Sequence, residues 1–105
     1  MRHWVYILSN RKRLTYVGIT NNVAWRLREH RWRRNQFTAK YRITRLVFVE
    51  EHSNKESALK RETQIKGWRR SKKHALIERT NPDWRDLWDG NERFLSLSRA
   101  QRGNL

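Results

Sequence analysis

The stretch LTYVGITNNVAWRLREH contains four side chains that can transfer protons or bind phosphate. They are Tyr16, Arg26, Arg28 and His30. A phenol or an imidazole can act as a general acid or base, and a guanidinium suits bidentate binding of phosphate. Arg26 and His30 are four residues apart and share a helix face, whereas Arg28 lies on another face. Alone, such a pair on a helix edge is more often simply solvated, so a functional interpretation needs further groups.

A second tyrosine, Tyr6, lies ten residues before Tyr16. Both occupy even positions in segments that we expect to be strands, Trp4–Leu8 and Thr15–Ile19. In an antiparallel hairpin, any register that pairs Tyr6 with an even-numbered residue places both rings on one face. A register of the other parity would separate the rings. Tyrosines in strands mostly serve packing, so the pair alone is a modest indication of a site.

Glu62 is the sharpest candidate. It lies one helical turn from the apolar residues Ala58, Leu59 and Ile65 in the expected helix Lys55–Lys66, which places it on a core-facing stripe. A carboxylate there is costly unless it is paired or bound to a metal. One interpretation is a buried ion pair with an arginine. The other is a single-carboxylate site for Mg²⁺ or Mn²⁺, which keep waters and substrate phosphates as their other ligands.

Lys66 follows Glu62 by four residues on the same helix face. It either pairs with Glu62, or it assists chemistry by contacting phosphate and lowering the pKa of a nearby phenol. The basic run Lys66–His74 is a solvated face or a patch that binds a phosphate backbone without reading sequence.

The elements that must position these residues follow from periodicity and capping signals. A helix starts at Asn21 or Asn22 and reaches about His30, and Arg31–Tyr41 is expected to be a loop. Thr44–Glu50 contains the run LVFV and is interpreted as a central strand, covered on both faces. The capping-box pattern Ser53–Glu56 opens the helix that Gly67 ends. Two further helices are expected, from Ser71 to about Arg79 and, after Asp83, a short one before Gly90.

The expected fold is therefore α/β (α+β), with a small three-stranded mixed or antiparallel sheet flanked by helices in the order β-β-α-β-α-α-α. We expect one domain over residues 1–89, with residues 90–105 as a polar tail or a loosely docked helix.

Composition narrows the class of partner. The 105 residues include 25 Lys+Arg and 10 Asp+Glu, a formal net charge of +15, and no cysteine. Disulfides, zinc fingers and thiol nucleophiles are thus excluded, and the charge predicts binding to nucleic acid. No apolar run is long enough to span a membrane or to form a signal peptide, so we expect a cytoplasmic protein that acts away from membranes. The sequence implies no protein partner.

Six tryptophans lie among or near basic residues, which suits stacking on single-stranded bases, although most are expected to fill the core. The expected nucleic-acid-binding residues are Trp25, Arg28, Trp32, Arg33, Arg34, Lys40, Arg42, Arg69, Arg70, Lys72 and Lys73.

The segments VYIL and TYVG resemble the two signature triplets of the GIY-YIG nuclease superfamily, with Val5 where the family carries glycine. GITNNVAWRLREH resembles the next family segment and ALKRETQIKGW the one that supplies a metal-binding glutamate. The whole run to LIERTNPDWRDLW, over roughly residues 2–89, is similar to small stand-alone bacterial members. The resemblance implies catalytic roles for Tyr6, Tyr16, Arg26, His30 and Glu62.

The implied activity is that of a metal-dependent endonuclease that hydrolyses phosphodiester bonds in DNA, with single-stranded or branched DNA as the preferred substrate and RNA left open. One Mg²⁺ or Mn²⁺ would bind Glu62, and Arg26 would neutralise the transition state. Tyr6 or Tyr16 would activate water if nearby cations lower its pKa, and His30 would relay the proton. Gly18 is expected to allow a tight turn between strand and helix. The alternative is a non-catalytic DNA- or RNA-binding module with a vestigial site.

Overall fold

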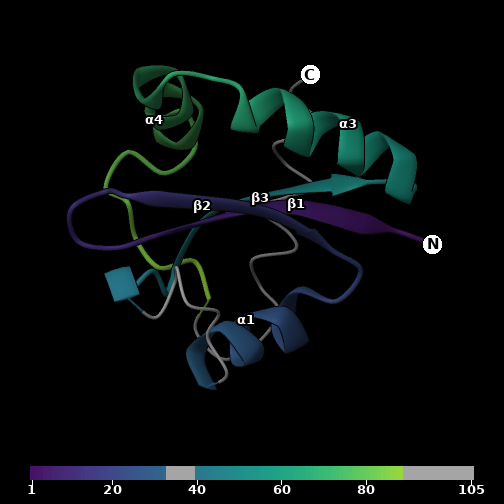
Figure 1. The fold of residues 1–105 in the computed structure, drawn as a ribbon, viewed down its shortest axis with the longest axis horizontal. Helices are drawn as coiled ribbons and strands as arrows, with labels where there is room; N and C mark the ends of the chain where they lie inside the picture. The colour runs from purple at the N-terminus through teal and green to yellow at the C-terminus, as the bar shows by residue number, and fades with distance from the viewer. Residues whose placement is uncertain (33–39, 89–105) are drawn as a thin grey trace.

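A computed structural model describes residues 1–32 and 40–88 of the chain. Three strands, β1 (His3–Ser9), β2 (Thr15–Thr20) and β3 (Arg45–His52), form one antiparallel sheet. The strand order is β2-β1-β3 (Figure 1). The expected hairpin of the first two strands is confirmed, but the prediction of a central third strand is wrong. Because helices cover both faces of the sheet, even an outer strand carries a continuous apolar run.

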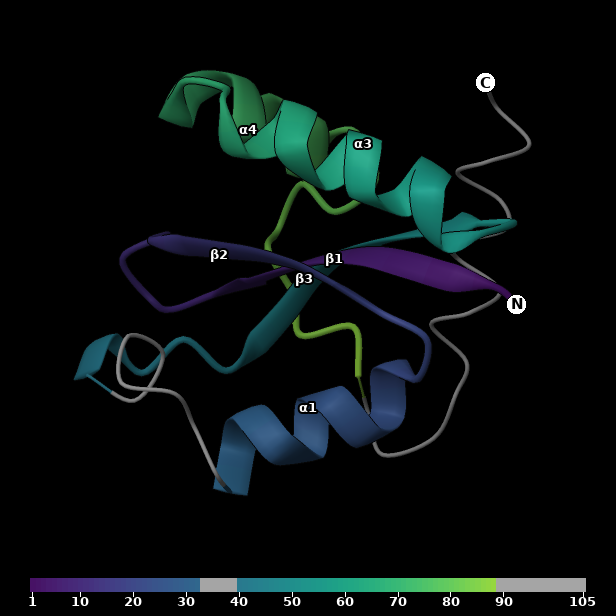
Figure 2. The ribbon, with the colours of Figure 1, turned by 45° about the vertical axis from the view of Figure 1, so that its right-hand side comes forward.

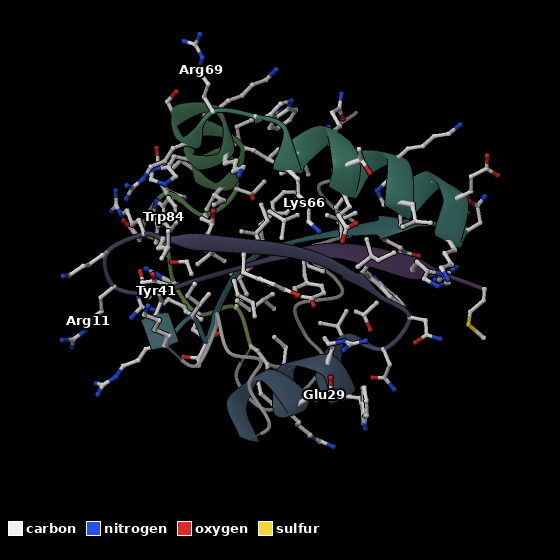
Figure 3. All side chains as sticks on the ribbon, viewed as in Figure 1. Arg11, Glu29, Tyr41, Lys66, Arg69 and Trp84 are labelled. Atoms are coloured by element: carbon white, nitrogen blue, oxygen red, sulfur yellow. The ribbon has the colours of Figure 1, made fainter. Side chains whose placement is uncertain are left out.

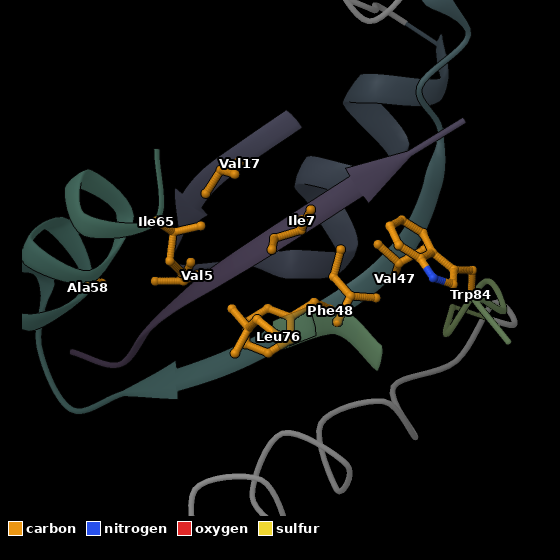
Figure 4. Packing of buried hydrophobic residues seen from close by; sticks show 10 residues of the cluster. Val5, Ile7, Val17, Val47, Phe48, Ala58, Ile65, Leu76 and Trp84 are labelled. Carbon is orange, nitrogen blue, oxygen red and sulfur yellow. The ribbon is translucent and has the colours of Figure 1, made fainter. Parts of the chain in front are cut away.

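The helices lie in two layers. Helix α1 (Val23–Trp32) covers one face of the sheet, and α3 (Lys55–Lys66) and α4 (Arg70–Glu78) cover the other (Figures 1 and 2). Alternating residues of β1 serve the two layers. Val5 and Ile7 pack with α3 and α4, as Figure 4 shows, whereas Tyr6 and Leu8 pack with α1.

A bulge in β3 keeps both layers filled. Ile7 pairs with Phe48, but Leu8 pairs with Leu46, so Val47 is an extra residue. Val47 and Phe48 consequently pack in the same core cluster, on the side of α3 and α4. Such an insertion turns successive side chains to the same side of a strand.

Local signals fix the helix ends. The Trp25 N–H donates to Asn22 Oδ1 at 3.0 Å, and the Ser57 N–H donates to Asn54 Oδ1 at 2.8 Å, as N-caps do. Asn54 rather than Ser53 therefore caps α3. Helix α4 begins at Arg70, one residue before the expected start at Ser71, and it has no side-chain cap.

The short helix predicted after Asp83 is absent from the described residues, which end at position 88. This segment instead runs beside β3, where the Leu87 N–H donates to Leu46 O at 2.8 Å. Asn81 Nδ2 donates to Val47 O at 3.1 Å, and Trp84 adopts a positive φ of 55°. These tertiary bonds replace the capping that the local sequence offers.

The observed order is thus β-β-α-β-α-α. Helix α1 runs on to Trp32, into the segment predicted to be a loop; residues 33–39 of that loop and residues 89–105, with the tail, lie outside the described part of the chain. No helix in the described part of the chain combines the length and the apolar character needed to cross a membrane.

Candidate active site

Tyr6 and Tyr16 lie on the same face of the sheet, the face that α1 covers. Tyr6 pairs with Gly18 and Tyr16 with Leu8, which is the even parity needed to place both rings on one face. The ring centroids are 6.4 Å apart with an interplanar angle of 38°. The hairpin register therefore brings two phenols together beside the edge of β2.

Gly18 makes room for the Tyr6 ring. A Cβ built at position 18 would lie 2.5 Å from Tyr6 Oη and 2.6 Å from Cζ, which is closer than side chains tolerate. Gly18 is inside β2, so the prediction that it supports a turn is wrong. The absence of a side chain lets the Tyr6 ring cross from the central strand onto the outer strand, on which Tyr16 also lies.

The pKa of Tyr6 is raised, chiefly because burial disfavours the phenolate, and next because of Tyr16. Arg26 acts in the opposite direction, while Glu62 and Glu29 raise the pKa further. The condition set for Tyr6 as a base, a pKa lowered by cations, is thus not met, and Tyr6 stays protonated at neutral pH. Tyr16 is less buried than Tyr6.

Arg26 faces this pair from α1. Its Nη1 donates to Glu29 Oε1 at 2.7 Å, while its Nε is buried and has no hydrogen-bond partner in the described residues. A buried donor without a partner is uncommon and costly. Its place on the tyrosine face makes it a candidate to bind a ligand oxygen. Glu29 was not singled out from the sequence, although its position three residues after Arg26 could have indicated the pair.

Glu62 comes from α3, on the opposite side of the sheet. Its side chain is only 16% exposed, and Oε2 lies 3.5 Å from Lys66 Nζ. The pairing with Lys66 is therefore confirmed, and the alternative, an ion pair with an arginine, is not seen among the described residues. Figure 3 shows Lys66 reaching down from α3 to β2, while Glu29 lies on α1 on the other side of the sheet. Glu29 on α1 and Glu62 on α3 both raise the pKa of Tyr6, so this phenol interacts with charges from both helical layers.

The buried stripe of α3 differs from the predicted one. Leu59 is 41% exposed, and the buried residues are Ala58 and Ile65. Arg61, by contrast, is only 23% exposed. Glu62, with a side chain that is 16% exposed, therefore lies at the margin of the core rather than in its middle.

Sequence reasoning missed a second polar cluster. Arg61 Nε donates to Glu50 Oε1 at 3.0 Å. His52 Nε2 lies 2.8 Å from the same oxygen, and His52 Nδ1 lies 2.6 Å from Ser57 Oγ. Glu50 is buried at the end of β3, so the cluster satisfies a buried carboxylate. A charged residue directly after the run LVFV was the available signal.

The donor set fits a weakly held, hydrated divalent cation. Across residues 1–32 and 40–88, no three or more His, Asp or Glu side chains gather to hold a metal ion. Mg²⁺ and Mn²⁺ often use one or two carboxylates and retain waters, which Glu62 can provide. A cation there must displace the Lys66 ammonium.

The other predicted residues are spread over the surface. Trp25 is 53% exposed, and its ring lies 5.5 Å from Arg26 Cζ. Arg28, Lys40, Arg42, Arg69, Arg70 and Lys72 are exposed and Lys73 is half-buried. The side chains of His30 and Trp32 and all of Arg33 and Arg34 lie outside the described part of the chain.

Comparisons with known proteins show which family the chain resembles. The model of the GIY-YIG catalytic domain matches residues 2–75. A UPF0213 protein of Staphylococcus haemolyticus is 37% identical over 81 residues, covering 73% of this chain and 95% of that protein. A UPF0213 protein of Syntrophus aciditrophicus is 37% identical over 86 residues, covering 78% and 95%.

A solved structure agrees. The solution NMR structure of a UPF0213 protein from Bacillus halodurans superposes with a TM-score of 0.54 at 29% identity, covering 82% of this chain and 93% of the other. Together with the paired tyrosines, Arg26 and Glu62, these matches show that the chain belongs to the GIY-YIG family.

Proposed function

We propose that this protein is a metal-dependent endonuclease that hydrolyses phosphodiester bonds in DNA. One observation carries the proposal: buried Tyr6 packs 6.4 Å from Tyr16, and its pKa responds to the charges of Arg26 and Glu62, although these residues come from three different elements. Phosphoryl transfer needs positioning and neutralisation of charge more than covalent help. A phenol pair, a guanidinium and a carboxylate supply both.

The roles follow from protonation and exposure. Tyr6, whose pKa is raised by burial, donates a hydrogen bond to the phosphate or to the attacking water. Tyr16, which is less buried, is the residue that takes a proton from water. Arg26 binds a nonbridging oxygen through its unpartnered Nε and neutralises charge in the transition state. His30 is proposed to relay the proton.

Glu62 is the residue that would hold a divalent cation. When bound, the cation neutralises phosphate charge and stabilises the leaving oxygen. Without the cation, the Lys66 ammonium pairs with the Glu62 carboxylate. Once displaced by the cation, Lys66 assists the reaction by contacting the phosphate.

The surface around the site favours a single strand or a branched end. Trp25 exposes its ring next to Arg26, which suits stacking of an unpaired base beside the bound phosphate. The cations of α4 adjoin the β-hairpin, because Arg70 Nη2 donates to Lys12 O at 2.9 Å. These cations extend the basic surface but read no sequence.

The test compares Glu62→Gln with Glu56→Gln, a matched change at an exposed position of the same helix. Each protein is incubated with end-labelled single-stranded, duplex and branched DNA and with RNA, in Mn²⁺, Mg²⁺ or chelator. We expect metal-dependent cleavage by the wild type and Glu56→Gln, at least a hundredfold loss in Glu62→Gln, and a preference for single-stranded or branched DNA.

Equal cleavage by both variants would indicate a contaminant and overturn the proposal. Binding of nucleic acid by wild type without any cleavage would instead establish a non-catalytic binding module. Cleavage of RNA alone would overturn the choice of DNA.

A further inference from the structure

A cleft of about 510 Å³ opens at the hairpin end of the sheet. One wall is the turn between β1 and β2, and the other is the segment that leads into β3. Figure 3 shows Arg11 and Tyr41 at this end of the molecule. The described lining residues include five cations and no carboxylate; the cations are Arg11, Lys12, Lys40, Arg42 and Arg45. Such a concave cationic surface attracts a polyanion.

Asn10 joins the two walls. Its Oδ1 accepts hydrogen bonds from the N–H groups of Lys12 and Leu14, each at 3.0 Å. Its Nδ2 donates to Tyr41 O at 2.8 Å. The side-chain amide of Asn10 therefore shapes the turn and also anchors the opposite wall, so the cations are presented on a constrained backbone rather than on independent loops.

Arg42 occupies an unusual backbone conformation, with φ at 54°. Non-glycine residues in the left-handed region are uncommon, and they concentrate at ligand-binding sites, where the surrounding structure holds them. Here the conformation lies between the cleft wall and Ile43, which packs in the same core cluster as Tyr6 and Leu27. The strained residue is thus Arg42 itself, whose exposed side chain is carried by backbone that the buried Ile43 anchors to the core on the α1 side.

The cleft is close to the candidate active site along the hairpin. Ser9, which lines the cleft, pairs with Thr15, whereas Tyr6 pairs with Gly18 three positions further along the ladder. Three residues of strand span about 10 Å, a distance that three nucleotides of one DNA strand cover at about 3.4 Å each when their bases stay stacked. A strand bound at the tyrosines can therefore reach the cleft.

We propose that this cleft is a second anion site, which binds the sugar–phosphate backbone of a single DNA strand a few nucleotides from the scissile bond. The inference rests on the proposed endonuclease function, and it adds the path of the bound strand, from the tyrosines along the hairpin to the cleft. The exposed ring of Tyr41, over which Lys40 Nζ lies 5.4 Å from the centroid, provides a surface on which a base can stack.

The experiment measures binding of fluorescent dT15 by anisotropy, in chelator and over a range of salt. Arg11→Gln/Arg42→Gln removes two cleft cations, and Lys55→Gln/Lys60→Gln removes two exposed cations of α3 as the matched control. Thermal melting verifies that both variants fold. We expect about a tenfold loss of affinity in the cleft variant, with the salt slope reduced by about 1.4, the value for two phosphate contacts on a single strand. The control should lose less than about twofold.

Equal weakening in both variants would show a general effect of net charge and overturn the site. Tyr41→Leu is expected to weaken binding of dT15 about fivefold and to leave binding of an abasic oligonucleotide unchanged; equal losses on both would contradict binding of a base-bearing strand. Because the assay needs no cleavage, failure of the nuclease proposal would leave the binding result intact, and failure of the cleft would leave metal-dependent cleavage intact.

Discussion

The Tyr6 ring lies directly over Gly18, its cross-strand partner in the hairpin. The central strand thereby delivers a phenol to the outer strand, where groups from both helical layers meet. This relationship ties the stability of the sheet to the geometry of the candidate site, because neither residue can change size alone.

We predict that Gly18→Ala lowers the free energy of unfolding by about 1–3 kcal/mol, the usual cost of overpacking, and abolishes cleavage. Gly67→Ala is the control, since a Cβ there meets its nearest heavy atoms at 3.6 and 3.7 Å, which is ordinary contact. Denaturant unfolding and nuclease assays measure both effects. A second variant, Tyr6→Leu, should make the cost of Gly18→Ala smaller; additive costs would contradict the contact.

Alkaline pH should destabilise the protein partly through Tyr6. Its pKa is raised above the ordinary value of 10.0, so above about pH 10 the unfolded chain releases this proton while the folded chain retains it. The contribution of Tyr6 to the free energy of unfolding is therefore fully present below pH 10 and decreases as the pH rises above it. For wild type, this loss is about 1 kcal/mol between pH 10 and 11, and Tyr6→Phe should remove it.

Melting temperatures from pH 8 to 11 test this prediction, with Tyr41→Phe as the control because Tyr41 is exposed. The control should keep the alkaline loss of wild type. Parallel curves for wild type and Tyr6→Phe would show that the Tyr6 phenol ionises as freely in the folded chain as in the unfolded one.

The buried pair of Glu50 on β3 and Arg61 on α3 should contribute more to stability than an exposed ion pair within α3. We expect Glu50→Ala to cost about 3 kcal/mol, because it leaves a mostly buried guanidinium without its carboxylate. Glu56→Ala breaks the exposed pair with Lys60 and should cost less than about 0.5 kcal/mol. Urea unfolding compares the two, and similar losses would contradict a structural role for the buried cluster.

Periodicity predicted the three strands and the helices α1, α3 and α4, because each has a local apolar pattern. The parity of Tyr6 and Tyr16 even predicted that they share a face. Strand order could not be predicted, because helices cover both faces of the sheet, so an outer strand such as β3 has the same apolar run as a central one. The helix expected after Asp83 failed for a similar reason: bonds from Asn81 and Leu87 to β3 are tertiary and have no local signature.

The site residues named from the sequence stay a prediction, and the arrangement of Tyr6, Tyr16, Arg26 and Glu62 was foreseen only in part. The apolar stripe placed Glu62 near the core, yet Leu59 proved exposed and Arg61 mostly buried. The partners Glu29 and Glu50 were missed, because short-range pairs such as Arg26–Glu29 are common on helices and carry no functional signal by themselves. The function of Gly18 was misassigned, since only the register reveals that Tyr6 lies over it.

Lys66 should compete with a divalent cation for Glu62, because its ammonium lies 3.5 Å from Oε2. We predict that Lys66→Met lowers the Mn²⁺ concentration needed for half-maximal thermal stabilisation severalfold, a readout independent of cleavage. Lys60→Met, which frees the exposed Glu56, should leave the Mn²⁺ dependence unchanged, and in Glu62→Gln the Mn²⁺-dependent shift should disappear. If Lys66→Met leaves the Mn²⁺ dependence as in wild type, the lysine does not pair with the metal-binding carboxylate, and the cation must bind elsewhere.

If Lys66 also contacts phosphate, its loss should lower the cleavage rate at saturating Mn²⁺, which separates its pairing with Glu62 from its assistance in the reaction.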